Sequence, residues 1–501
     1  MIRILAAAIA TLAVAAPAAA AAPRDVLYVG NNWDGTADVV DPVSFQKLAR
    51  MNIVPDKAER MAEIQADPDR QGYFLAIRQA VGEGHDQFVD DMFSSHDGRF
   101  LYVSRPSFAD VVAFDLHTRK IVWRVPVEGY RADHMAISPD GTRLAVSAST
   151  ARKVHMIDTA TGKIAGSFES GDQPHENNYS ADGRLLYHAS IGSVFTPADE
   201  PALDDTKGDR WFEVVDARTL QVLKRLDMGE KLEQAGYPDM SSAVRPMALA
   251  PDEKQVYFQV SFFHGFVEYD LVQDKVLRLA RLPVSDEAAG KRREEYLLDS
   301  AHHGLAMNPQ GTKLCAAGTM SDYAAIVRRD TFATKLAAHG LKPYWATNSG
   351  DGRYCFVSFS GDDRVSVISY ATEREVASVP VGDHPQRMRM GALAEDALGA
   401  ASSPGRPGGP RLKLRVSVRP RHVRAGRPVR LRVRVTVKRG GRQVAVRRAR
   451  VRVAGVTART GRRGRAVLRK RRGFDRVRRY RVRASRSGYR TGFARIRSTR
   501  G

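Results

Sequence analysis

Residues 131–171 read RADHMAISPDGTRLAVSASTARKVHMIDTATGKIAGSFESG, and this stretch predicts one four-stranded antiparallel sheet. Pro139-Asp140-Gly141 is a type I turn signal, because proline presets φ and glycine tolerates a positive φ. Residues 153–158 alternate with the period of two that is typical of a strand. We call the four expected strands A to D in chain order.

Similar units recur at a period of about 40 residues between residues 26 and 394. Six of them begin with an A–B turn, at Asp97-Gly98, Asp140-Gly141, Asp182-Gly183, Asp252-Glu253, Gln310-Gly311 and Asp351-Gly352. A seventh unit is split between the ends, with strands B to D in residues 26–54 and strand A in residues 386–393. The repeat predicts an all-β, seven-bladed β-propeller, since one such sheet buries both faces only when neighbours stack on it. We expect its N- and C-terminal strands to pair and close the ring, which removes exposed sheet edges.

The segments SPDGTRLAVS, KVHMIDTATGKI and DDRVSVISYATEREVASVPVGDHP resemble the YVTN family of β-propeller repeats. The resemblance covers residues 26–394 and implies a seven-bladed propeller. It also implies an exported or surface-associated protein that binds a ligand. Some relatives of this fold work as lactonases or as quinoprotein or metal redox subunits. The repeat motifs are specific for the fold and do not transfer any of these activities.

Charge divides the 501-residue chain, whose overall net charge is +23. Residues 1–400 hold 43 Lys+Arg and 55 Asp+Glu, whereas residues 401–501 hold 36 Lys+Arg and a single acid, Asp475. We predict a signal peptide (1–22), the propeller (23–396), a Gly/Pro/Ser linker (397–410) and an Arg-rich β-sandwich (411–501). PVRLRVRV, RRARVRVAG and TARTGRRGRAVL resemble bacterial immunoglobulin-like or carboxypeptidase-regulatory-like modules. Here Arg462, Arg463 and Arg465 stand where such modules often carry acids.

The N-terminus predicts secretion. Met1-Ile2-Arg3 precedes an apolar run over residues 4–16, and small residues end in Ala20-Ala21-Ala22. A basic start, a short apolar core and an A-x-A site are typical of a secretory signal peptide cleaved after Ala22. The absence of a cysteine after the apolar run argues against a lipid anchor, and we expect no transmembrane segment in the mature protein.

The two cysteines, Cys315 and Cys355, fall on B strands of neighbouring units. Aligning KLCAAG with YCFVS places them on opposite faces of their own sheets. They therefore either face each other or both face away. The sequence leaves the two geometries equally open, and it favours two buried small side chains over a disulfide.

Four longer segments interrupt the repeats: residues 55–84, 193–210, 229–243 and 285–301. The first and the last have helical composition, and the second is acidic. All lie at D-to-A or B-to-C connections, which emerge on one side of a four-stranded meander. We therefore expect function on that side of the disc.

The start of strand A carries a candidate ligand-binding site. Equivalent positions are Asp90, Asp133, His175, Arg245, His303, Tyr344 and Gln386, and the next column is Asp91, His134, Glu176, Pro246, Gly304, Trp345 and Arg387. Strand A lines the central channel of a propeller, so these columns should ring its mouth. The ligand-binding candidates are Asp90, Asp133, His134, His175, Glu176, Arg245, His303, Tyr344 and Arg387.

Imidazoles near this mouth offer an alternative metal site. The metal candidates are His85, His134, His175, His302, His303 and His384. A solvated channel lining and a small-molecule or anion site compete with it, and the consecutive His302 and His303 should point to opposite sides of a strand. The chain has no CxxCH, GxSxG, HExxH, P-loop or strand-to-helix GxGxxG, so we nominate no catalytic residue and require no cofactor.

The basic C-terminal region predicts either an anionic envelope polymer as partner or a merely solvated face. Nucleic acid is disfavoured because Phe474, Tyr480, Tyr489 and Phe493 are too few and too scattered for a stacking groove. The hypothesis is an exported binding or scaffold protein at the cell envelope, with a small molecule or protein bound on the insertion side. The alternative is an enzyme or redox subunit, metal-dependent, quinoprotein or lactonase-like, that uses the axial His/Asp cluster.

Overall fold

A computed structural model describes residues 22–194, 203, 206–296, 298, 300–398, 413–439, 442–474, 477–486 and 492–500. The chain divides into two compact units, Met1–Ser402 and Ser403–Gly501. Almost all of the predicted signal peptide, most of the acidic loop and most of the linker lie outside the described residues. Among the described helices, none is both long and apolar enough to cross a membrane.

The described part of the first unit consists of seven four-stranded antiparallel sheets. The first three, in sheet order, are β28 (Pro385–Leu393), β1 (Arg24–Asn31), β2 (Thr36–Val40) and β3 (Lys47–Asn52); β4 (Met92–Ser94), β5 (Phe100–Arg105), β6 (Asp110–Asp115) and β7 (Ile121–Pro126); and β8 (Ala132–Ile137), β9 (Arg143–Ala148), β10 (Lys153–Asp158) and β11 (Lys163–Glu169).

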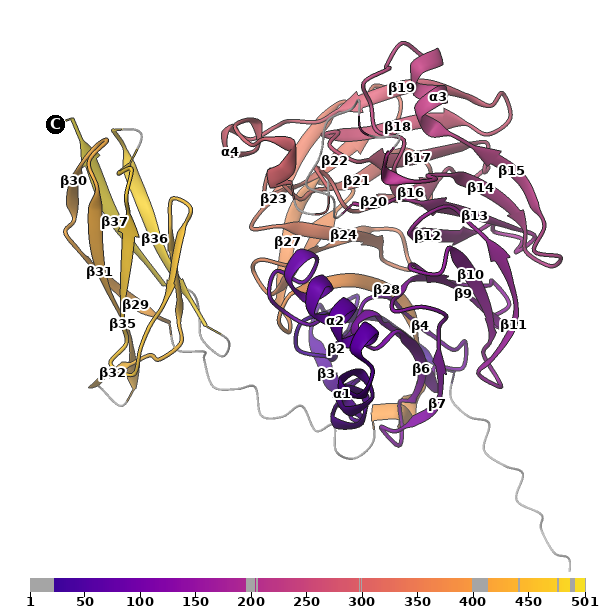
Figure 1. Ribbon diagram of the computed structural model, residues 1–501, viewed down its shortest axis with the longest axis horizontal. Helices are drawn as coiled ribbons and strands as arrows, with labels where there is room; N and C mark the ends of the chain where they lie inside the picture. The colour runs from indigo at the N-terminus through magenta and orange to yellow at the C-terminus, as the bar shows by residue number, and fades with distance from the viewer. Residues whose placement is uncertain are drawn as a thin grey trace, which may run out of the picture. The chain divides into compact units, whose positions relative to one another are not determined.

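The next two sheets are β12 (Pro174–Tyr179), β13 (Leu185–Ser190), β14 (Phe212–Asp216) and β15 (Val222–Leu226); and β16 (Val244–Leu249), β17 (Gln255–Val260), β18 (Gly265–Asp270) and β19 (Lys275–Arg281). The last two are β20 (Leu305–Met307), β21 (Lys313–Gly318), β22 (Tyr323–Arg328) and β23 (Thr334–His339); and β24 (Pro343–Asn348), β25 (Tyr354–Phe359), β26 (Arg364–Ser369) and β27 (Arg374–Pro380). This arrangement fits the predicted β-propeller (Figure 1).

The A–B turns form for the reason that the sequence indicates. Gly141 has a φ of 74°, in the region that glycine tolerates best. Asp140 Oδ1 accepts hydrogen bonds from the Thr142 amide at 3.0 Å and from the Ser138 hydroxyl at 2.5 Å. The Asp side chain thereby closes the turn and sets the register between β8 and β9.

Strands from the two ends of the first unit lie side by side. β1 pairs antiparallel with β28, and Tyr28 lies opposite Arg389. The Tyr28 hydroxyl donates to the Ala392 carbonyl oxygen at 2.8 Å. The sheet-edge strands β28, β4, β8, β12, β16, β20 and β24 contact one another in that order, and β24 contacts β28. These seven strands carry the predicted axial residues.

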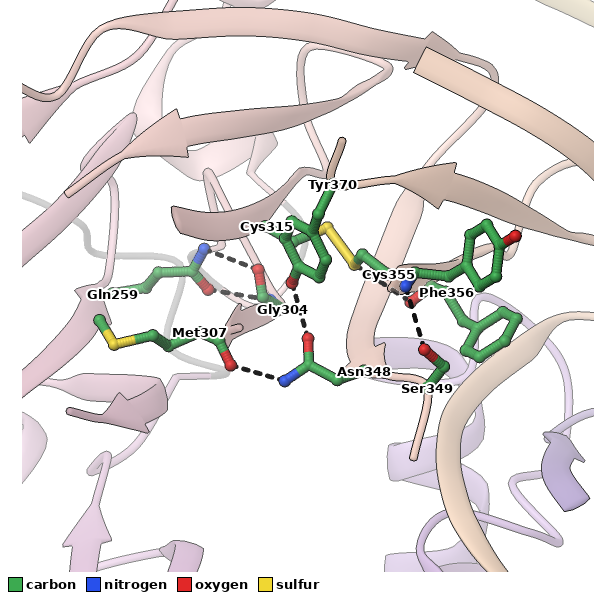
Figure 2. Close-up of a disulfide and its surroundings, with 10 residues drawn as sticks. Gln259, Gly304, Met307, Cys315, Asn348, Ser349, Cys355, Phe356 and Tyr370 are labelled. Carbon is green, nitrogen blue, oxygen red and sulfur yellow. Dashed lines mark hydrogen bonds between the residues drawn. A yellow bond between two sulfur atoms is a disulfide. The ribbon is translucent and has the colours of Figure 1, made fainter. Parts of the chain in front are cut away.

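A disulfide joins Cys315 on β21 to Cys355 on β25, so the two side chains face each other (Figure 2). This settles the geometry that the sequence leaves open. The Asn348 amide nitrogen donates to the Met307 carbonyl oxygen at 2.6 Å and adds a second link between the same two sheets. Both cysteines are buried in a cluster of small and apolar side chains.

Helices occupy only part of the insertions. Residues 55–84 form α1 (Lys57–Ala66) and α2 (Pro68–Ala80), as predicted, and residues 229–243 include the end of α3 (Met228–Gln234). The described residues of 285–301 include the short α4 (Asp286–Ala289) and the 3-10 turn η3 (Arg293–Glu295). A further 3-10 turn, η1 (Pro106–Phe108), follows β5.

A short turn follows the last strand of the first unit. Residues Glu395–Leu398 form the 3-10 turn η5, and Ala397 packs into the core of the first unit. The first unit therefore extends past residue 396, because burial of Ala397 ties the turn to the sheets.

The second unit contains two sheets around one core. One sheet is built from β29 (Arg415–Arg419), β31 (Val429–Arg439), β32 (Arg442–Ala445) and β35 (Arg465–Lys470); the other is built from β30 (His422–Arg424), β37 (Gly492–Thr499), β36 (Arg479–Ser485), β33 (Arg450–Val453) and β34 (Val456–Arg459). Leu431 and Val433 of the first sheet and Val451 and Val482 of the second are buried together. Alternate residues on these strands are exposed arginines, as the period-two pattern predicts.

Candidate functional site

The seven residues of the first predicted column line a single cavity of about 30 Å³. They are Asp90, Asp133, His175, Arg245, His303, Tyr344 and Gln386, one from each sheet or the loop entering it, and His134 lines the cavity with them. Each stands at the start of the edge strand of its sheet, where the chain enters from the insertion side. The common register of the A–B turns thus brings residues from distant parts of the sequence to one place.

Apolar residues of the insertions close the cavity. Val81, Val194 and Leu298 contribute to its lining, and they come from three different insertions. Val194 and Leu298 also pack with Ile191 and Ala243 in a small hydrophobic cluster, which we call the plug. Arg245 donates a hydrogen bond to the Leu298 carbonyl oxygen and so links the plug to the polar residues of the cavity.

Three imidazoles converge at the cavity. His134 lies on β8, His175 on β12 and His303 just before β20, so three separate sheets supply them. Their exposed fractions are 3%, 5% and 1%. One ring nitrogen from each lies within 4.8 Å of the others. The ring centroids of His134 and His175 are 3.8 Å apart, and that of His303 lies 6.2 Å and 5.8 Å from them.

Hydrogen bonds orient two of the rings. His134 Nδ1 lies 3.0 Å from Glu176 Oε2, and His303 Nδ1 lies 3.4 Å from the Tyr344 carbonyl oxygen. Because a carbonyl oxygen only accepts, the His303 proton resides on Nδ1 and its Nε2 carries a lone pair. Glu176 Oε2 and the Arg387 guanidinium both contact the His134 ring.

Two carboxylates adjoin the imidazoles. His134 Nε2 lies 3.4 Å from Asp133 Oδ1 and 3.7 Å from Asp90 Oδ2. Asp133 is held by Arg131 at 3.2 Å and by the Ser149 hydroxyl at 2.9 Å. Asp90 Oδ2 is buried without a hydrogen-bond partner among the described residues. Of the two acids, Asp90 therefore has the greater capacity to accept a ligand.

Arg387 is the cation nearest to the imidazoles. Its guanidinium contacts the His134 ring, lies 3.3 Å from Glu176 and 3.6 Å from Asp90, and covers the Trp345 ring at 3.9 Å. Asp91, next to Asp90 in the sequence, is directed elsewhere and binds Arg389 through two hydrogen bonds of 2.8 Å each.

Burial sets the protonation states of the cluster. It lowers the pKa of His134, His175 and His303 well below the usual value, and nearby arginines act in the same direction. Burial raises the pKa of Asp90 to about 7, against the opposing effect of Arg387. It also raises the pKa of Glu176. The imidazoles are therefore neutral at pH 7 and able to act as ligands or hydrogen-bond partners.

The remaining metal candidates lie away from these three rings. His85 and His384 stack on opposite faces of Trp33, with centroid distances of 3.9 Å and 3.8 Å. His302 packs against Tyr323 and His264, with its Nε2 3.3 Å from the Tyr323 hydroxyl. His302 and His303 both precede β20 and have different ring neighbours, which are Tyr323 and His264 for His302 and Tyr344 for His303.

The sequence patterns did not indicate three polar residues of the cavity, Gln87, Arg131 and Gln173. Arg131 donates to Gln87 Oε1 at 2.6 Å, and both line the cavity. Arg131 precedes Asp133 by two residues and so shares its side of the strand, a signal that the period-two rule could have revealed. Gln87 lies in a loop and has no such signal.

No protein-family model matches the chain, and no curated protein matches it. Among solved structures the chain is similar to hydrazine synthase from Kuenenia stuttgartiensis, with 18% sequence identity, a TM-score of 0.48, and coverage of 69% of this chain and 92% of that chain.

Proposed function

We propose that this chain is an exported YVTN-like binding or scaffold protein of the cell envelope, with a seven-bladed, closed propeller and an immunoglobulin-like basic unit. The propeller offers its axial cavity to a ligand, and the basic unit attaches the protein to an anionic polymer. The seven four-stranded sheets and the pairing of β1 with β28 support the closed ring. The N-terminal sequence pattern supports export.

One observation carries the polymer-binding part: arginines face arginines across the strands of both sheets in the second unit. The described pairs are Arg419–Arg432, Arg430–Arg469, Arg434–Arg465, Arg450–Arg459, Arg452–Arg483, Arg479–Arg497 and Arg481–Arg495. Like charges directly opposite each other destabilise a sheet. Residues 401–501 contain one acid, Asp475, to offset them.

A polyanion relieves this repulsion. Side chains on one face of a strand repeat every ~6.6 to 6.8 Å, so each arginine row presents charge at regular intervals. A polymer that neutralises the row also releases its own counterions, which makes binding strong at low salt and weak at high salt. Phe474 and Tyr480 are buried in the core, which leaves few aromatic rings for stacking with bases.

The test measures binding of the full-length protein to poly-glutamate and to teichoic acid between 50 mM and 500 mM salt. We expect affinity to fall steeply with salt. Replacing Arg430, Arg432 and Arg434 together by glutamine should reduce the slope of log K against log[salt] by about one per contacting arginine. The matched control replaces Arg184, Arg328 and Arg353 together by glutamine, which removes three exposed arginines of the first unit.

Salt-independent binding, or equal loss of binding in the control, would contradict the polymer-binding role.

A second candidate function is a metal-dependent or redox site. The three axial imidazoles alone favour it, and it concerns the first unit rather than the second.

A further inference from the structure

We propose that His134, His175 and His303, completed by Asp90, bind one divalent first-row transition ion of the Zn²⁺ or Cu²⁺ class in the axial cavity. This inference deepens the axial part of the proposed function by naming its ligand. It does not depend on polymer binding by the second unit.

The donor atoms are close enough for one ion. Imidazole nitrogens bound to Zn²⁺ at about 2.0–2.1 Å in a tetrahedral site lie roughly 3.4 Å from one another. The three rings already hold nitrogens within 4.8 Å, and Asp90, Asp133 and His134 form an overlapping group with the same limit. Side-chain movements of about 1 Å therefore bring the three imidazoles to this spacing. Asp90 shares the 4.8 Å limit with His134, so it approaches the ion from the side of that ring.

Two buried atoms at the cavity have unmet hydrogen-bonding capacity. Asp90 Oδ2 and His175 Nδ1 have no hydrogen-bond partner among the described residues, and the nearest charged group to Asp90 Oδ2, Arg387, is 3.6 Å away. Asp90 and His175 are 4% and 5% exposed, and both line the cavity. A buried polar atom without a partner is costly, and each such atom in a folded protein calls for an explanation. A cation in the cavity supplies one for both atoms.

The outer contacts resemble those of metal-bound histidines. A ligating histidine usually donates its second ring N–H to a carboxylate or a backbone carbonyl, which fixes the ring and its tautomer. Glu176 serves His134 and the Tyr344 carbonyl serves His303 in this way. Both rings then direct Nε2 to the ion. Glu176 and the Tyr344 backbone are thus positioning groups.

The donor set selects the class of ion. Imidazole nitrogen suits zinc, copper, iron and nickel, whereas Mg²⁺ and Ca²⁺ prefer oxygen ligands throughout. Ile191, Val194 and Leu298 of the plug line the cavity and should slow exchange of the ion. A volume of about 30 Å³ accommodates an ion with one water molecule.

Arg387 competes with this ion for the imidazoles and carboxylates of the cluster. Its guanidinium contacts the His134 ring, so an incoming cation meets an existing positive charge. Glu176 and Asp91 offer Arg387 an alternative position, at 3.3 Å and 3.8 Å from its nitrogens. The inference therefore predicts that Arg387 weakens metal binding, a result opposite to that expected if Arg387 itself is the resident cation of the cluster.

The experiment uses the full-length protein, stripped with EDTA and dialysed against Zn²⁺ or Cu²⁺, with bound metal measured by elemental analysis. We expect one ion per chain, and Cu²⁺ electron paramagnetic resonance with splitting from equatorial nitrogens. His175→Ala and His303→Ala should each weaken binding more than 100-fold, and Glu176→Gln about 10- to 100-fold. His339→Ala, which removes an exposed histidine of β23, is the control and should bind as the wild type does.

Arg387→Gln is the most discriminating variant. It should tighten metal binding about tenfold or more, because it removes a positive charge that repels the ion. Circular dichroism and thermal unfolding of the first unit verify that each variant is folded. The proposal is overturned if the wild type does not bind one equivalent, or if His175→Ala and His303→Ala retain it. Either result leaves the polymer-binding proposal untouched, because that rests on the second unit.

Discussion

His188 is a buried neutral histidine whose ring is fixed from both sides. Its Nε2 lies 2.7 Å from the Ser170 hydroxyl and its Nδ1 lies 2.9 Å from Asn177 Oδ1. Burial lowers its pKa from 6.5 to about 3. The folded state thus binds this proton less readily than the unfolded state, and stability falls as pH drops below about 6.5.

We predict that His188→Gln reduces the acid sensitivity of the first unit. Between pH 7 and pH 5, the wild type should lose about 2 kcal/mol of unfolding free energy through His188, a loss that the variant lacks. Urea unfolding at the two pH values measures the difference, whatever the variant's stability at pH 7. The exposed His339→Gln is the control, and an unchanged pH slope in His188→Gln would refute the assignment.

Individual contacts also explain why Arg387 and Arg389 differ in role. Arg389 has both Asp91 oxygens at 2.8 Å and is neutralised by one neighbour. Arg387, two residues earlier, shares Asp90 and Glu176 at longer distances and touches an imidazole instead. The positive charge of Arg387 is therefore not neutralised by one close carboxylate. An ion added to the cavity changes the balance of charge there.

At the scale of elements, the link between β21 and β25 is covalent. The disulfide joins residues that are 40 positions apart and ties two neighbouring sheets together. A cross-link of this span restricts the unfolded chain and typically contributes about 2–4 kcal/mol to stability.

We predict that Cys315→Ala with Cys355→Ala lowers the melting temperature of the first unit by several degrees, in line with about 2–4 kcal/mol. A reducing agent should lower the wild-type value toward that of the variant and leave the variant unchanged. Scanning calorimetry with and without reductant measures both. Identical melting of the oxidised wild type and the variant would show that the bond contributes nothing.

At the scale of the whole molecule, β28 connects the ends of the first unit. Met388 and Leu393 of this strand are fully buried in two different clusters, and Arg387 and Arg389 reach the axis. Without β28, β1 becomes an exposed edge in a sheet of three strands.

We predict that deleting residues 386–393 destabilises the entire first unit while the second unit melts as before, because the core of the second unit lies wholly within residues 414–496. Calorimetry should show a large downward shift of one transition only. A truncated protein that melts with the full-length chain would contradict closure by β28 and the blade count that depends on it.

Local patterns carry most of the fold. The Asp-Gly turns and the period-two strands each depend on a few adjacent residues, so the sequence alone predicts the repeated four-stranded sheets and their register. That register also suffices to nominate Asp90, Asp133, His175, Arg245 and His303 as neighbours. Every strand A begins at the same level, and one polar residue at its start therefore meets its counterparts at the axis.

Only the tertiary structure decides which of these neighbours touch. The sequence allows Cys315 and Cys355 to face together or apart, and the packing of β21 against β25 brings them together. Likewise, His85 and His384 appear equivalent to His175 as candidates, yet stacking on Trp33 holds them apart from the cluster. Contacts between separate sheets depend on their packing and on side-chain rotamers. No local pattern in the chain encodes either.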